Sequence, residues 1–143
     1  MKKKIIIPIK VVQLGEEGTH IFCKAKVNGL KALVLIDTGA SKTVLAKSFA
    51  DKLGKLKKVK VDDNSTSGIG PESVEATFAR LNSLKFKSLN IKKLVVGTID
   101  VSHVVTMYET LGVKPFDIIL GGEVLEEYNA VIDYRRKCLM FNV

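Results

Sequence analysis

A run of four apolar residues that ends in an aspartate constrains the fold of this chain more than any other stretch. Residues 33–36 (LVLI) indicate a buried strand, because a strand that is apolar on both faces lies inside a sheet. Asp37 follows directly, where a buried charge is costly unless it is paired or hydrogen-bonded. Thr38 adds a hydroxyl beside this carboxylate, and Gly39 permits a sharp turn. The stretch predicts a catalytic carboxylate on a tight loop or, alternatively, an Asx turn in which Asp37 only hydrogen-bonds the backbone.

A second apolar run lies far downstream. Residues 117–121 (DIILG) end in a glycine, and residues 122–128 (GEVLEEY) follow as a short helix. The two segments, in this order, resemble the catalytic loop and the closing segment of the retropepsin-like aspartic proteases. The similarity extends over most of the chain, from about residue 19 to residue 141. It implies a mainly β fold, a closed acid-protease barrel with one or two short helices, and one such domain over residues 1–143.

Composition and turn signals agree with a β protein. Tryptophan is absent and aromatic residues make up only 6% of the chain, so the core must be built from Val, Ile and Leu, which favour strands. Strands are expected over residues 4–14, where Pro8 indicates either an edge strand or a strand with a break, and over residues 20–27 and 30–36. Asn28 and Gly29 join the last two as a hairpin.

Three further segments have a predicted structure. Residues 46–53 have helical spacing and end at Gly54. Residues 55–61 alternate between polar and apolar side chains and indicate an exposed strand. Residues 100–111 form a second helix capped by Asp100 or Ser102. One side of this helix is predicted to be apolar and to consist of Val101, Val104, Val105, Tyr108 and Leu111.

The turn-rich residues 62–71 lie between two predicted strands and indicate a projecting hairpin. The resemblance implies that this hairpin is the flap that closes over substrate, with Gly68, Ile69 and Gly70 at its tip. The alternative is an ordinary surface loop.

Aspartic protease chemistry requires two carboxylates that face one water molecule. The chain has a single Asp-Thr-Gly, because Asp117 and Asp133 lack the Thr/Ser-Gly that would follow. The second carboxylate must then come from a partner chain, which predicts a homodimer with Asp37 from each subunit. No metal or organic cofactor is expected, and the predicted substrate is a polypeptide.

The resemblance also implies the roles of the residues near Asp37. Thr38 would lock the paired loops through its hydroxyl, and Gly39 would hydrogen-bond substrate. The retroviral enzymes usually carry an acidic residue directly after Asp-Thr-Gly-Ala, but here Ser41 and then Lys42 follow, so substrate preference does not transfer. The residues expected to contact substrate are Ala40, Ser41, Val44, Gly68, Ile69, Gly70 and Ile119.

The positive charge of the chain raises the question of whether it binds nucleic acid or an anionic surface. The formal charge is +8, with +7 in residues 1–72 and +1 in residues 73–143. The excess is almost all lysine without interleaved aromatic residues, which favours a solubilising surface, so no nucleic acid partner is expected.

No apolar run approaches membrane-spanning length, and no cleavable signal is seen. We therefore expect a cytoplasmic protein that does not bind membranes. Cys23 and Cys138 could pair, but two reduced, half-buried thiols are favoured.

Two other functions compete with proteolysis. The same fold could hold a peptide or partner protein without cleaving it, or the basic half could support a nucleic-acid accessory role. The intact Asp37-Thr38-Gly39 favours an aspartic endopeptidase, because a binding module has no need for the carboxylate.

Overall fold

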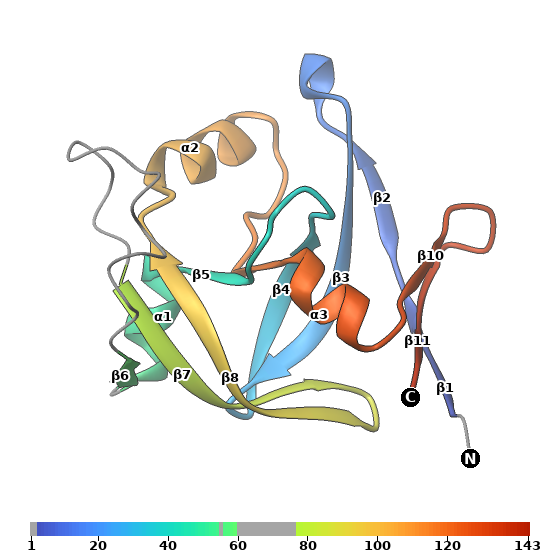
Figure 1. The fold of residues 1–143 in the computed structure, drawn as a ribbon. Helices are drawn as coiled ribbons and strands as arrows, with labels where there is room; N and C mark the ends of the chain where they lie inside the picture. The colour runs from blue at the N-terminus through green and yellow to red at the C-terminus, as the bar shows by residue number, and fades with distance from the viewer. Residues whose placement is uncertain (1–2, 55, 60–76) are drawn as a thin grey trace.

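The computed structural model describes residues 3–54, 56–59 and 77–143, and within them the chain is mainly β-structure (Figure 1). The described residues contain three short α-helices at the three places where the sequence indicates them, although the resemblance implied one or two: α1 (Lys47–Leu53), α2 (Ser102–Thr110) and α3 (Gly122–Glu127), with one 3-10 turn, η1 (Gly15–Glu17). The strands are β1 (Lys4–Pro8), β2 (Lys10–Gln13), β3 (Thr19–Val27), β4 (Leu30–Ile36), β5 (Val44–Ala46), β6 (Lys57–Val59), β7 (Thr77–Phe86), β8 (Leu89–Ile99), β9 (Ile118–Leu120), β10 (Val131–Asp133) and β11 (Cys138–Asn142).

Six of these strands close into a barrel. Their order is β3-β4-β9-β5-β8-β7, and β7 pairs back onto β3 through Lys26 opposite Lys85 and Val27 opposite Leu84. The short strands β2 and β6 extend the sheet beside β3 and β7. A separate sheet with the order β1-β11-β10 brings the two ends of the chain together. Closure leaves few free strand edges, which suits a chain built from short β segments.

Local sequence explains the first part of this order. Asn28 and Gly29 have φ angles of +48° and +83°, as a two-residue hairpin turn requires, and they join β3 to β4 as predicted. The predicted N-terminal strand breaks after Pro8, and its two halves enter different sheets. β1 pairs with β11, whereas β2 pairs with β3.

The core is aliphatic, as the composition predicts. Side chains with no exposed surface come from most barrel strands and include Val27, Val34, Leu81, Val96 and Ile118. The predicted apolar side of α2 is correct for Tyr108, which is buried, and for Val104 and Val105, which are half-buried. It is wrong for Leu111, which directly follows the last residue of the helix and is 43% exposed.

The part of the chain described here contains no helix that is long and apolar enough to cross a membrane. The predicted strand over residues 55–61 is present as β6, but residues 60–76, and with them the predicted flap, lie outside the described residues.

Candidate active site

Asp37 lies at the end of buried strand β4, where the chain leaves the barrel. Its backbone N–H donates to the Leu120 carbonyl at 3.0 Å, which extends the parallel pairing of β4 with β9 by one step. β9 therefore lies between parallel β4 and antiparallel β5. This arrangement holds both ends of the 37–43 loop against the same short strand. Figure 1 shows α2 and this loop in the upper part of the barrel.

The carboxylate of Asp37 turns the loop and remains exposed to solvent. Asp37 Oδ1 accepts the Gly39 N–H at 3.0 Å, and the Asp37 carbonyl accepts the Ala40 N–H at 3.1 Å. The Asx turn considered for Asp37 is thus present. In this turn, Oδ1 accepts the hydrogen bond from the backbone, and Asp37 remains exposed at the surface. Thr38, Gly39 and Ser41 are exposed as well, and Ala40 is half-buried.

Two glycines dock the loop against the start of α3. The Gly122 N–H donates to the Ala40 carbonyl at 2.7 Å. A Cβ on Gly121 would lie 2.6 Å from the Lys42 carbonyl carbon, so no side chain fits there. Glycine at position 121 therefore permits the β9–α3 junction to press directly on the backbone of the loop.

A buried threonine and a glutamate fix the other end of the loop. Thr43 has no exposed surface, and its Oγ1 donates to Glu123 Oε1 at 2.8 Å and accepts the Gly121 N–H at 3.0 Å. The Thr43 N–H donates to Glu123 Oε2 at 2.6 Å. Both carboxylate oxygens of Glu123 thus bind one residue. Sequence reasoning missed this pair, because nothing local links two polar residues that lie 80 positions apart.

The structure brings together part of the predicted substrate-contacting set. Val44 and Ile119 face each other in the β5–β9 register, and both are half-buried. They lie on strands that flank the Asp37 loop. Gly68, Ile69 and Gly70 lie outside the described residues.

Tyr108 of α2 was also missed as a neighbour of Asp37. Burial, and to a smaller extent the negative charge of Asp37, raise the pKa of the Tyr108 phenol, so this phenol stays protonated near neutral pH. Its hydroxyl lies 3.5 Å from His20 Nδ1, and its ring packs edge-on against Phe22 and Phe116. The sequence pattern had placed Tyr108 only on the apolar side of a helix.

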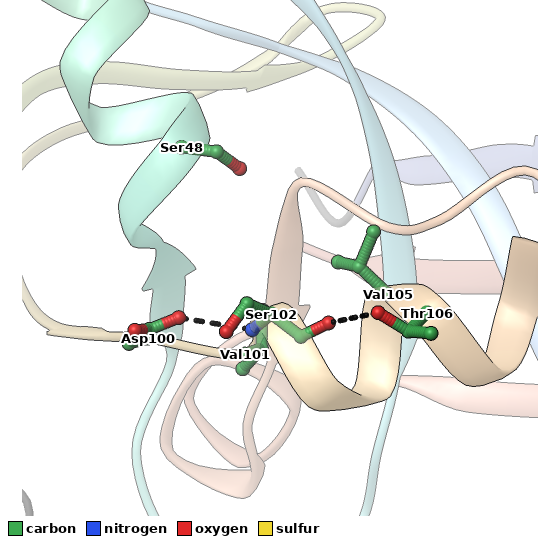
Figure 2. A pocket seen from close by; sticks show the side chains of 6 residues that line it. All are labelled: Ser48, Asp100, Val101, Ser102, Val105 and Thr106. Carbon is green, nitrogen blue, oxygen red and sulfur yellow. Dashed lines mark hydrogen bonds between the residues drawn. The ribbon is translucent and has the colours of Figure 1, made fainter.

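Two cavities lie away from Asp37. One of about 260 Å³ lies between α1 and the start of α2, and Figure 2 shows the six side chains that line it. Asp100 Oδ1 accepts the Ser102 N–H there at 2.9 Å, and hydrogen bonds from Ser102 lower the pKa of this carboxyl. The predicted cap is wrong, because the N-cap of α2 is Val101 and no side chain caps the helix; Asp100 only turns the chain one residue earlier. The other cavity, of about 680 Å³, runs between α1 and β7 and shares Asp100.

In the described ranges, no group of three or more His, Cys, Asp or Glu side chains is placed to hold a metal ion. What the Asp37 loop offers is an exposed carboxylate on a backbone fixed by β9 and α3.

Comparison with known proteins places this arrangement in a family. No curated protein matched the sequence. Among solved structures, a retropepsin-like aspartic protease from Rickettsia conorii is 25% identical, with a TM-score of 0.60 over 99% of this chain and 92% of that one. The retroviral protease-like domain of Ddi1 from Leishmania major is 14% identical, with a TM-score of 0.55 over 84% of this chain and 86% of that one. The EIAV protease in complex with the inhibitor HBY-793 is 23% identical, with a TM-score of 0.54 over 78% of this chain and 90% of that one.

The last two likenesses concern the fold alone, and together with the first they confirm the predicted retropepsin-like barrel. The profile of the aspartyl protease family matches residues 23–124, which include β4, the Asp37 loop, β9 and the start of α3. The chain therefore belongs to the aspartyl protease family.

Proposed function

We propose that this protein is an aspartic endopeptidase whose active site contains two Asp37 carboxylates, one from each subunit of a homodimer. The observation that carries this proposal is the exposed Asp37 carboxylate on a loop anchored by Leu120, Gly122 and Glu123. An exposed carboxylate on fixed backbone can meet a second copy of itself across a two-fold axis. Family membership supports the reaction type.

In the proposed mechanism, the two carboxylates share one proton, because two carboxylates held close together do not both ionise easily. The ionised Asp37 takes a proton from water as that water attacks the scissile carbonyl carbon. The protonated Asp37 hydrogen-bonds the carbonyl oxygen as negative charge develops there. The Oδ1···H–N bond from Gly39 holds each carboxylate in a fixed orientation for these steps.

Neighbouring residues would position the polypeptide. Thr38, exposed beside Asp37, is proposed to hydrogen-bond across the two-fold axis and hold the two loops together. Gly39, Ala40 and Ser41 would contact the substrate backbone. Val44 and Ile119 would line an apolar pocket, to which Gly68, Ile69 and Gly70 would add a lid.

We further propose that residues 1–143 act as one domain in the cytoplasm. Cys23 and Cys138 are both buried free thiols, which fits a reducing compartment.

Digestion of an unfolded polypeptide library by the wild-type protein and by Asp37→Asn tests the proposal. Asn keeps the shape of the side chain but cannot act as a base, so we expect cleavage by the wild type only. Asp51→Asn is the matched control, because Asp51 is an exposed aspartate on α1 and should be dispensable. Equal cleavage by Asp37→Asn and wild type would rule out Asp37 as the catalyst. Peptide binding without any cleavage would identify a binding module instead.

A further inference from the structure

Three lysines from three neighbouring strands lie in one row on the outside of the barrel. In the β3–β4 register Lys26 is opposite Lys31, and in the β3–β7 register Lys26 is opposite Lys85. Residues directly opposite each other in antiparallel strands point to the same side, and all three side chains are exposed. Lys24, two residues from Lys26, and Lys92, two residues from the partner of Lys85, extend the row on the same side. We call these five residues the lysine face: Lys24, Lys26, Lys31, Lys85 and Lys92.

The strands that carry this face contain no acidic residue. β3, β4, β7 and β8 together hold six lysines and one arginine, but no Asp or Glu. In the described part of the chain, the ion pair present is between Arg136 and Asp133, on the β10–β11 turn. The uncharged side chains beside the row include the polar Ser83 and Asn90. The positive charge of the face is thus not neutralised by its own strands.

This arrangement costs stability, because like charges directly opposite each other in a sheet repel. A merely solubilising surface needs no such row, since lysines mixed with acids serve that purpose without repulsion. A partner that brings several negative charges would remove the repulsion on binding.

We propose that the lysine face docks an acidic segment of the polypeptide substrate, away from the scissile bond; this proposal rests on the proposed endopeptidase function. Lys31 and Asp37 lie on one continuous stretch, at opposite ends of β4, so the face is about 20 Å from the catalytic carboxylate. An extended substrate needs at least about six residues to connect the two places. Figure 1 shows the β7–β8 hairpin crossing the lower ends of β3 and β4, on the other side of the barrel from α2.

The composition of the face favours this occupant over other anions. It carries no aromatic side chain on which bases could stack and no arginine to read a base edge, so it lacks the features that recognise nucleic acids. The exposed apolar residue beside the face is Leu30, but it alternates with Lys31 along β4 and so points to the other side of the strand, away from a bilayer laid on the lysines. Lys24 and Lys26 are about 6.7 Å apart along β3, which is also the spacing of alternate carboxylates in an extended acidic peptide.

Binding is tested on the Asp37→Asn protein, so that the outcome does not depend on cleavage. The probe is a fluorescein-labelled polyglutamate peptide, followed by fluorescence anisotropy at low ionic strength. The variant replaces Lys26, Lys31 and Lys85 by Gln. The matched control replaces Lys47, Lys52 and Lys114 by Gln, which are exposed lysines outside the strands of the face and give the same net charge.

We expect the face variant to weaken peptide binding about tenfold, from the loss of three exposed charge contacts. The control should change it less than about twofold, because it removes only distant, screened charge. The melting temperature of the face variant should stay equal or rise, since cross-strand repulsion is relieved. In the active protein, the same variant should raise KM for a substrate with an acidic tail without changing kcat. For a substrate without this tail, both KM and kcat should stay the same.

Equal weakening by the face variant and the control would overturn the proposal, because net charge alone would then explain binding. Tighter binding of duplex DNA or of anionic vesicles than of polyglutamate, at the same salt concentration, would also overturn it and assign the face to that partner. Binding without any peptidase activity would keep the docking surface and instead reject the proposed function.

Discussion

At the scale of single residues, the fixed position of the Asp37 loop depends on side chains that are absent or small. Gly121 is the sharpest case, because the atom nearest to a Cβ at this position would be the Lys42 carbonyl carbon, which cannot move aside as a side chain would. Glycine at this position is therefore required by close approach of two backbone segments.

Gly121→Ala is predicted to destabilise the protein by about 3 kcal/mol, because the added carbon overlaps the Lys42 backbone. Peptidase activity should fall further than stability alone explains, since the Asp37 loop must shift. Gly97→Ala is the control, because Gly97 lies in strand β8 and the nearest atom to its Cβ would be 3.7 Å away, an ordinary contact, so the substitution should cost less than about 1 kcal/mol. Urea unfolding measures the loss of stability in both variants, and equal losses would contradict the close-packing argument.

Cys23 provides a prediction about alkaline pH. Burial raises the pKa of its thiol from 9.0 to about 12, so the folded protein holds this proton after the unfolded chain has lost it. The contribution to stability is complete below pH 9 and is lost as pH rises from 9 to about 12, at up to about 1.4 kcal/mol per pH unit. Cys23→Ala should flatten the pH dependence of the free energy of unfolding in this window, and an unchanged slope in this variant would contradict the role of the Cys23 thiol.

At the scale of elements, the site depends on the contact between the 37–43 loop and the β9–α3 junction. Glu123 accepts two hydrogen bonds from Thr43 with its two carboxylate oxygens. Without the carboxylate, the buried Thr43 N–H would lose its partner, and an unpaired buried donor is costly.

Glu123→Ala is therefore predicted to destabilise the protein by about 2 to 4 kcal/mol and to lower kcat, because the end of the catalytic loop is released. Glu126→Ala is the matched control on the same helix, since Glu126 is exposed, and should have little effect. Thermal unfolding and the rate of peptide hydrolysis, measured for both variants, test this prediction. A Glu123→Ala protein as stable and as active as the control would mean that the Thr43 contact does not hold the loop.

The elements themselves could largely be predicted from the sequence. Strand β4, the Asn28–Gly29 turn, α1 and the β9–α3 segment follow from local sequence signals: an apolar run, an Asn-Gly pair, helical spacing and glycines. The Thr43–Glu123 pair and the packing of Tyr108 against Phe22 could not, because they arise only when distant segments pack together. Leu111 was predicted on the apolar side of α2 but is exposed, because helical spacing alone does not show where the surface that covers the helix ends.

At the scale of the whole molecule, one chain supplies one Asp-Thr-Gly loop, and two-carboxylate chemistry needs two. The row of lysines adds a second constraint at this scale, since it lies at the opposite end of β4 from Asp37. Any substrate that uses both must be long enough to connect them.

Subunit mixing gives the most direct prediction about assembly. If the active site is shared, a wild-type subunit paired with an Asp37→Asn subunit has one carboxylate and should be inactive. Adding a ninefold excess of Asp37→Asn protein and allowing exchange should leave about one tenth of the wild-type activity, because about nine in ten wild-type subunits then have a mutant partner. Asp51→Asn in the same excess should not inhibit. Activity that is unaffected by excess Asp37→Asn, after light scattering has shown dimers that exchange, would mean that each chain carries a complete site and that the second acid must be sought elsewhere in the chain.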